Sequence, residues 1–245
     1  VICLKLFLFA KDRAVMDPTE IRELIARHPL FVEMGPEVVD RMVSAGRVAR
    51  FPVGKILFQQ SDDGDALYCV LGGRVRISRC TPDGREVIIT LMSRGEIFGE
   101  MALLDNMPRT ADATIEESAT LLVVLKSEFQ SLLRLYPILT LHLLRMICNR
   151  LRESNERVED AALLPVPARL AKRLLNLNDK IGIGDPVRIS QSDLGRFLGT
   201  SRESVNKHLK RWSNEGFLEL GRNVVRLLDI EALKTIALGE LEEDE

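Results

Sequence analysis

The sequence predicts an α+β protein with an N-terminal β-jelly roll, a long helix and a C-terminal winged helix-turn-helix domain. Three observations support this prediction. Short strand-like runs separated by glycine turns follow Val48, an uninterrupted helical pattern follows Pro137, and a helix-turn-helix pattern covers residues 191–210. With 245 residues, 46% hydrophobic and 29% charged, the chain has the composition of an ordinary globular protein and the length for two domains.

We expect four segments along the chain. Residues 1–16 are an upstream extension or an expression remnant, 17–136 the β-rich domain, 137–164 the long helix and 165–245 the helix-turn-helix domain. The first ten residues are apolar apart from Lys5, but they are too short to span a bilayer and carry no leader cleavage signal. We therefore expect a cytoplasmic protein without a membrane partner.

The β-rich domain begins with short helical patterns between Asp17 and Arg47, which break at Pro29 and at 35–36. Strands are then expected at 51–58, 66–71, 74–79 and 86–92, and a final pair at 111–115 and 120–125 closes the jelly roll. Glycine-rich turns separate most of these runs, which is typical of a jelly roll.

Charge and cysteine content restrict the function classes. The formal net charge of −2 conceals a basic region, since 13 Lys and Arg stand against 8 Asp and Glu between Leu163 and Gly239, before an acidic end at 240–245. A modestly basic domain is compatible with contact to phosphates. The four cysteines show no C-x-x-C spacing, so we expect reduced thiols and no metal site.

One segment, 98–111, has the residue types needed to hold a small cyclic phosphodiester. Gly99 lets backbone amides approach an anion closely, and the residues after it present further amides. Glu100 accepts a sugar hydroxyl, and Arg109 offers a charged fork to phosphate oxygens. The candidate residues are Gly99, Glu100, Met101, Ala102, Arg109 and Thr110. The alternative is a hairpin loop with an incidental ion pair.

This segment resembles the phosphate-binding cassette of the cyclic nucleotide-binding fold. From about Arg22 to Leu228 the chain resembles the cyclic AMP receptor protein/fumarate-nitrate regulator superfamily of bacterial transcription regulators. The resemblance implies that Glu100 binds the ribose 2′-hydroxyl, while Arg109 and Thr110 bind the cyclic phosphate. It also implies that strand residues line the base and the sugar, namely Ile77, Ile89 and Thr90.

The long helix carries a seam of residues at alternating spacings of three and four. These residues are Leu141, Leu144, Cys148, Leu151, Asn155, Val158 and Ala162. Such a seam favours a parallel homodimer, although a helix packed on its own domain is the alternative. The resemblance implies that Ser154 and Asn155 contact the adenine, one from each subunit, although the receptor itself carries Thr-Ser there. Asn155 is also a residue type that fixes helix register.

The helix-turn-helix pattern has Gly195 for close packing and Gly199 for the turn, and Thr200 or Ser201 caps the second helix. The Ser-Arg-Glu that begins this helix resembles the family's recognition helix. At the position of Lys207, however, the cyclic AMP receptors of the family have arginine. Runs at 218–220 and 224–228 predict a wing. The expected DNA-binding residues are Ser190, Gln191, Thr200, Ser201, Arg202, Glu203, Ser204 and Lys207. The alternative is an αα-hairpin that merely packs.

The sequence thus predicts a homodimeric, DNA-binding transcription regulator with a cyclic nucleotide as allosteric ligand. Cyclic AMP is the expected ligand and cyclic GMP the competing one, and a palindromic double-stranded DNA is the expected partner. The resemblance adds RNA polymerase as a partner and transcription activation as an expected role. A regulator of the same fold that senses redox state, haem or a metabolite, or that binds DNA constitutively, is the alternative. An enzyme acting on phosphodiesters with Glu100 as base is not expected, because no histidine lies nearby in the sequence.

Overall fold

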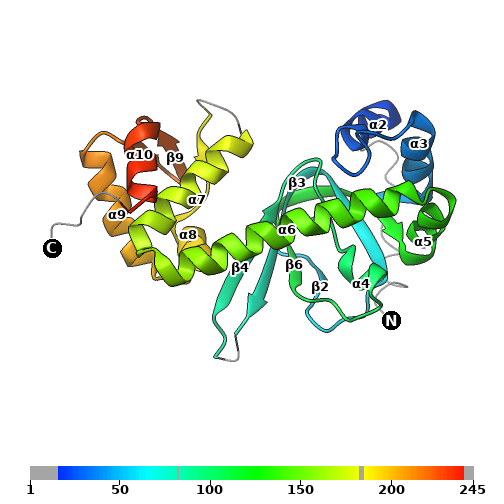
Figure 1. Cartoon of the computed structure of the whole chain (residues 1–245), viewed down its shortest axis with the longest axis horizontal. Helices are drawn as coiled ribbons and strands as arrows, with labels where there is room; N and C mark the ends of the chain where they lie inside the picture. Colours follow the sequence, from blue (N-terminus) through cyan, green and yellow to red (C-terminus); the bar gives the residue numbers. More distant parts are fainter. Residues whose placement is uncertain (1–15, 82, 182–184, 240–245) are drawn as a thin grey trace. The chain divides into compact units, whose positions relative to one another are not determined.

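The computed structural model describes residues 16–81, 83–181 and 185–239, without the side chains of residues 180 and 181. The chain divides into two compact units (Figure 1). The first unit runs to Arg85 and from Ile89 to Arg150, and the second comprises Glu86–Ile88 and the residues from Leu151 onward. The expected extension, apart from Met16, and the acidic end at 240–245 lie outside the described residues.

The first unit begins with two short helices, as the sequence predicted. Helix α2 (Pro18–Ala26) starts at Asp17, whose carboxylate accepts a hydrogen bond from the amide of Thr19 at 2.8 Å. Helix α3 (Pro36–Ala45) starts after Gly35, and each helix has proline in its first turn. Two further helices of this unit were not predicted, α4 (Met101–Leu104) and α5 (Lys126–Leu135).

Antiparallel pairing organises the larger sheet, which belongs to the first unit apart from Glu86–Ile88. The strands are β1 (Gly46–Phe51), β2 (Ile56–Phe58), β3 (Ala66–Cys80), β4 (Glu86–Met92), β5 (Ile97–Phe98) and β6 (Asp112–Leu125). They lie in the order β1-β6-β3-β4, with β2 added to β6 and β5 added to β3. The α+β prediction is confirmed, with an N-terminal antiparallel sheet domain, a long helix and a C-terminal helix-turn-helix domain.

Three strand boundaries were predicted wrongly. The runs at 66–71 and 74–79 form one strand, β3, and those at 111–115 and 120–125 form one strand, β6. These two strands pair with each other along most of their length, and register shifts around Gly72 absorb the irregularity. The run at 51–58 is instead two strands, β1 and β2, because a turn at Gly54 with φ of 79° interrupts it.

The alternation of side chains along β3 divides the core of the first unit into two clusters. Leu67, Cys69 and Leu71 pack with α2, α3 and α5, whereas Tyr68 and Val70 pack with β2, β5 and the inner residues of β6. Burial raises the pKa of the Cys69 thiol to about 12, so this cysteine stays protonated.

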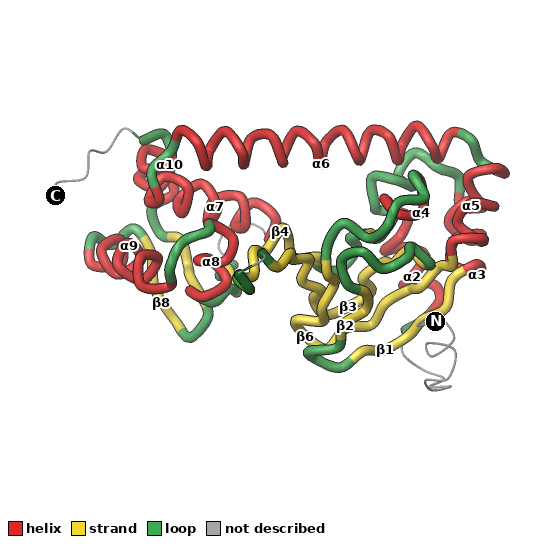
Figure 2. The backbone as a smooth tube through the Cα atoms, turned by 90° about the horizontal axis from the view of Figure 1, so that it is seen from below, coloured by secondary structure: helices red, strands yellow, loops and turns green. Residues whose placement is uncertain are grey.

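The predicted long helix is α6 (Ile138–Leu163), which is continuous over its whole length (Figure 2). Large seam side chains are exposed in the single chain. They are Leu141 at 52%, Leu144 at 56%, Leu151 at 59% and Val158 at 66%. Within the described residues, no helix taken singly has the length and apolar character to cross a membrane. Helices α5 and α6 pass that test only as a pair bent by 115°.

The second unit contains the predicted helix-turn-helix and wing. Its elements are α7 (Val166–Ile181), β7 (Val187–Arg188), α8 (Gln191–Leu198), α9 (Arg202–Asn214), β8 (Leu218–Gly221), β9 (Val224–Leu227) and α10 (Ile230–Ala237). Helix α10 was not predicted. The three strands form a small sheet in the order β7-β9-β8, and Leu194, Val205, Leu209 and Trp212 lie in the core between helices and sheet.

Candidate functional site

Arg109 lies between β5 and β6 in the chain, and its side chain is only 2% exposed. Its Nη1 donates to the carbonyl oxygen of Gly99 at 2.6 Å. Its Nη2 donates to the carbonyl oxygen of Ala66 at 2.7 Å and to Oδ1 of Asp65 at 3.2 Å. The guanidinium carbon lies 4.1 Å from the centre of the Phe58 ring. Nε, by contrast, is buried and has no partner in the structure.

The backbone conformation at position 99 favours glycine. Its φ is 84°, and a Cβ there would lie 2.9 Å from Nη1 of Arg109 and 3.3 Å from the carbonyl oxygen of Ala66. Gly99 ends β5 and lets the chain turn at Glu100 into α4. The local fold thus brings the backbone of this turn and the guanidinium together.

Glu100 is 1% exposed and forms an ion pair with Nη1 of Arg150, a residue of α6. Nη2 of Arg150 donates to the carbonyl oxygen of Ile97 at 2.5 Å. The second carboxylate oxygen of Glu100, Oε2, is buried and has no partner in the structure. A buried acceptor and the buried donor of Arg109 are therefore left unpaired in one part of the first unit.

A cavity of about 80 Å³ joins these groups. It is lined by Phe58, Ile77, Met92, Phe98, Gly99, Glu100, Met101, Ala102, Arg109, Thr110, Ala111 and Arg150. The structure thus brings together seven of the predicted ligand-binding residues. Ile89 and Thr90, also predicted, are not among the lining residues. Ser154 and Asn155 are exposed on the part of α6 that belongs to the second unit.

The cavity contains residues that the sequence analysis missed. Phe58 and Phe98 line the cavity and form an aromatic group with Tyr68, which is not a lining residue, with ring centres 5.2 to 6.2 Å apart. Aromatic residues in strands are expected in any core, so no sequence signal singled them out. Arg150 is one of several arginines on the long helix, and its spacing does not distinguish it from the others.

His28 is a half-buried titratable group of the same unit. Its Nδ1 accepts a hydrogen bond from the amide of Leu30 at 3.0 Å. Burial and, to a smaller extent, the positive charge of Arg150 together lower the pKa of His28 to about 4. The ring is therefore neutral at pH 7.

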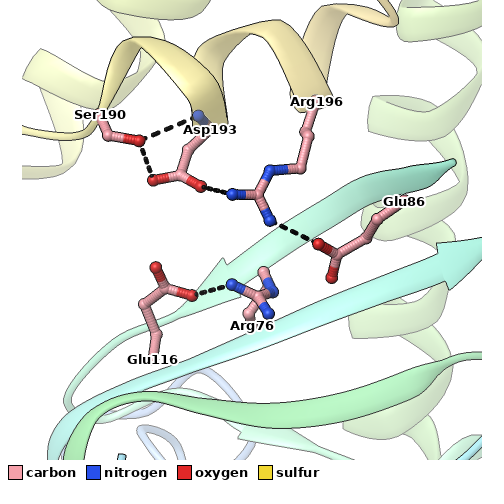
Figure 3. Close-up of polar contacts among 6 residues, drawn as sticks. All are labelled: Arg76, Glu86, Glu116, Ser190, Asp193 and Arg196. Carbon is pink, nitrogen blue, oxygen red and sulfur yellow. Dashed lines mark hydrogen bonds and ion pairs between the residues drawn. The ribbon is translucent and has the colours of Figure 1, made fainter. Parts of the chain in front are cut away.

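Polar side chains fix the first helix of the helix-turn-helix and the strand pair β3–β6 (Figure 3). Ser190 caps α8, because its hydroxyl oxygen accepts from the amide of Asp193 at 3.0 Å, and the hydroxyl donates to the Asp193 carboxylate at 2.5 Å. Asp193 also pairs with Arg196 at 3.2 Å. In the first unit, Arg76 pairs with Glu116 at 2.6 Å across β3 and β6.

The second helix of the motif, α9, is capped by Ser201, whose hydroxyl oxygen accepts from the amide of Ser204 at 3.1 Å. The two capping candidates are thereby resolved in favour of Ser201. The turn before it has Gly199 at φ of 65°. Ser201, Arg202, Glu203 and Lys207 are exposed, whereas Thr200 and Ser204 are half-buried. Hydrogen bonds from its own amide and from Ser201 lower the pKa of Glu203.

A groove of about 350 Å³ lies in the second unit, where the start of α8, the start of α9 and the β8–β9 turn meet. Predicted DNA-binding residues that line it are Ser190, Gln191 and Arg202, and the turn adds Arg222 and Asn223. Two arginines and the N-terminus of α8 give this groove a positive character, which suits phosphate oxygens.

Within residues 16–81, 83–181 and 185–239, no group of three or more His, Cys, Asp or Glu side chains is arranged to hold a metal ion. The cysteines of this part, Cys69, Cys80 and Cys148, are free thiols.

Two family sequence patterns match the chain. The family described as "Cyclic nucleotide-binding domain" matches residues 48–136, and the family described as "Crp-like helix-turn-helix domain" matches residues 168–236. The first match contains the cavity-lining residues except Arg150, and the second contains α8, α9 and the wing.

Curated relatives align over nearly their whole length. The "CRP-like cAMP-activated global transcriptional regulator" of Mycobacterium tuberculosis is 32% identical over 217 residues, covering 86% of this chain and 97% of the relative. The "Cyclic AMP receptor protein" of Thermus thermophilus is 35% identical over 211 residues, with the same coverage. A solved structure of a c-di-GMP responsive global regulator from Xanthomonas campestris shares the fold, with a TM-score of 0.69 and 24% identity. It covers 79% of this chain and 99% of its own.

Proposed function

The chain belongs to the CRP/FNR family of DNA-binding transcription regulators, a family without enzymatic activity, and on that premise we propose that it is a homodimer whose DNA affinity depends on cyclic AMP. The chain has a cyclic nucleotide-binding domain and a helix-turn-helix domain, so both halves of such a switch are available. The proposal also places the protein in the cytoplasm, where a bacterial regulator meets double-stranded DNA.

One observation carries the ligand assignment. Nε of Arg109 and Oε2 of Glu100 are both buried without a partner, and both residues line the same cavity. A buried donor and a buried acceptor left unpaired cost free energy, of the order of 1–3 kcal/mol each. A cyclic nucleotide supplies the complementary groups, because its phosphate accepts from Arg109 and its ribose hydroxyl donates to Glu100.

The positions of the polar groups determine how the proposed nucleotide lies. The phosphate and the sugar face the buried Arg109 and Glu100, while the base lies towards the rim, where Met101 is 47% exposed and Thr110 is exposed. In the proposed dimer, Ser154 and Asn155 contact this base, and Ile89 and Thr90 remain candidate contacts to it.

Cyclic GMP is the competing ligand at this site. The hydroxyl of Thr110 follows the phosphate arginine and is exposed, so it is available to a guanine as well as to a phosphate oxygen. Cyclic di-GMP enters the comparison because the Xanthomonas regulator is described as responsive to it. The phosphate and sugar contacts alone do not distinguish these ligands, so binding must be compared directly.

Dimerisation is proposed through α6. Its seam residues Leu141, Leu144, Leu151 and Val158 are half or more exposed in the single chain, and parallel pairing of two helices would cover them. In the dimer, two α9 helices about 34 Å apart would enter successive major grooves of a palindromic site. Base edges would be contacted by Arg202, Glu203 and Lys207. Phosphates would be bound by the remaining predicted residues, Ser190, Gln191, Thr200, Ser201 and Ser204. RNA polymerase is the proposed partner of the bound dimer.

Calorimetry with cyclic AMP, cyclic GMP and cyclic di-GMP tests the ligand assignment. We expect saturable binding of cyclic AMP to the full-length chain, tighter than that of the other two, and a loss of at least about 30-fold in Arg109→Ala, corresponding to about 2 kcal/mol. The matched control is Arg94→Ala, which removes an exposed arginine of the same unit. Unchanged affinity in Arg109→Ala would refute the site, and preference for another ligand would replace cyclic AMP.

A further inference from the structure

Two arginines of α7 contact the last turn of α8. Nη1 of Arg169 donates to the carbonyl oxygen of Leu198 at 3.0 Å. The guanidinium carbon of Arg173 lies 3.8 Å from the centre of the Phe197 ring. Because Arg169 and Arg173 are four residues apart, they share one face of α7. We call this pair the α7 clamp.

The clamp acts where the position of the recognition helix is set. Leu198 is the last residue of α8, and the last carbonyls of a helix have no partner within it. Arg169 supplies a donor and a positive charge at this negative helix end. Only residues 199–201 separate α8 from α9, and Gly199 has φ of 65°. Any displacement of the end of α8 therefore moves the start of α9, where Arg202 and Glu203 lie.

The burial of the two guanidinium groups of the clamp costs free energy, so a gain in stability alone does not explain it. Nε of Arg169 and Nε of Arg173 are both buried without a partner in the structure. Burial, aided by the positive charge of Arg157, lowers the pKa of Arg173 to about 10. A leucine at position 173 would cover Phe197 without removing a charge from water. Buried charged groups of this kind are better explained by the specific geometry that they impose.

Helix α6 also contacts α7 at this point. Lys172, next to Arg173, pairs with Asp160 of α6 at 2.6 Å. On α6, the charge of Arg157 lowers the pKa of Arg173 and the charge of Glu153 raises it. Nε of Arg157 donates to the carbonyl oxygen of Glu153 at 3.1 Å. These contacts form a connected series within the second unit, from α6 through α7 to the end of α8.

We propose that Arg169 and Arg173 are positioning residues for DNA reading, which hold the turn before α9 in the register that specific DNA requires. This inference rests on the proposed role of α9 in reading base edges. A misplaced α9 still presents its cations to phosphates, whereas contacts to base edges need correct placement. Loss of the clamp therefore lowers affinity for specific DNA much more than affinity for other DNA.

The test compares the full-length wild type with Arg173→Met, Arg173→Lys and Lys234→Met. The last variant is the control, since it removes one positive charge from an exposed pair in the same unit. Fluorescence polarisation measures two affinities at one salt concentration, with and without cyclic AMP. One duplex is selected by the wild type from a random pool, and the other is a scrambled duplex of the same composition.

We expect Arg173→Met to lower the ratio of specific to scrambled affinity about tenfold, with scrambled affinity changed less than about twofold. Arg173→Lys should recover part of the ratio, and Lys234→Met should leave it unchanged. An unchanged ratio in Arg173→Met overturns the clamp. If wild type itself shows no preference for the selected duplex, the proposed DNA reading fails and the clamp with it.

A second variant keeps the proposal testable if Arg173→Met does not fold. Phe197→Leu removes the ring but leaves an apolar side chain at a half-buried position. Circular dichroism establishes that the variant is folded. The ratio of affinities should then fall by about threefold, because the ring contact is lost while the charge of Arg173 remains. A folded Phe197→Leu with the wild-type ratio would contradict the clamp.

Discussion

At the scale of single residues, the site combines features that the sequence predicts with others that it cannot. Glu100 and Arg109 were identified because their residue types and their spacing after Gly99 suit a cyclic phosphodiester. Arg150, which pairs with Glu100, lies 50 residues away in another element, and only the folded chain brings it to the cavity. Phe58 is missed for a different reason, since strand aromatics normally serve packing alone.

His28 provides a prediction of pH dependence at the residue scale. Its pKa of about 4 in the folded chain lies below the ordinary value of 6.5. Between these two values the unfolded chain binds a proton that the folded chain rejects, so stability falls as the pH decreases from 6.5 to 4. We expect His28→Asn to remove about 2 kcal/mol of that loss, measured by denaturant unfolding across this pH range.

The control for this measurement is His208→Asn, which replaces a half-buried histidine of the second unit. This control measures how far any histidine substitution alters the dependence on pH between 6.5 and 4, and His28→Asn should reduce that dependence more. If His28→Asn and wild type lose stability in parallel over that range, burial of a neutral His28 is not the cause of the acid sensitivity.

At the scale of elements, the capped helices α2 and α9 were predicted, whereas the capped helix α10 and the strands interrupted by glycine were not. Asp17 and Ser201 begin α2 and α9 through local hydrogen bonds that the sequence already specifies. Gly72-Gly73 resembles a turn, yet β3 continues through it, because pairing with β6 on both sides outweighs the local preference. At Gly73 a Cβ would lie 2.3 Å from the carbonyl oxygen of Ser118, so this glycine permits close strand contact.

The helix-turn-helix offers a prediction at the element scale, because its two glycines have different functions. A Cβ at Gly195 would lie 2.9 Å from the backbone carbonyl oxygen of Thr200, whereas a Cβ at Gly199 would meet nothing within 4 Å. Gly199→Ala should cost about 1–2 kcal/mol through its positive φ alone. Gly195→Ala should cost more, since backbone must move, and denaturant unfolding of both variants measures the difference. Equal losses would contradict this account of the turn.

At the scale of the whole molecule, the exposed seam of α6 predicts self-association. Leu151→Glu should convert the proposed dimer into a monomer, because two charged side chains would replace an apolar contact at the helix pair. The side chain is 59% exposed in the single chain, so we expect the folded monomer to lose less than about 0.5 kcal/mol. Analytical ultracentrifugation measures the association state.

The matched control is Leu135→Glu, since Leu135 is similarly exposed, at 57%, but lies on α5 outside the seam. This variant should remain dimeric. Dimeric Leu151→Glu, or a wild type that is monomeric at micromolar concentration, would show that the seam is not the interface.

The fold class followed from the sequence because the change from strand to helix periodicity and the two motifs are local features of the chain. The contacts of α6 with the base of the ligand did not follow from the chain's own residues. Ser154 and Asn155 were assigned to the base by resemblance, not by contacts within the chain. The cavity residues and the residues proposed to read DNA lie in separate units of the chain. The central claim is therefore a coupling between two sites, and such coupling is typically about 5- to 150-fold.

The most direct test of that claim is the affinity of the full-length chain for a palindromic duplex, measured by fluorescence polarisation with and without saturating cyclic AMP. We expect cyclic AMP to tighten binding at least about tenfold in wild type and to have no effect in Arg109→Ala, because a ligand shifts the equilibrium only through its differential affinity. Equal DNA affinity with and without cyclic AMP in the wild type would contradict the account.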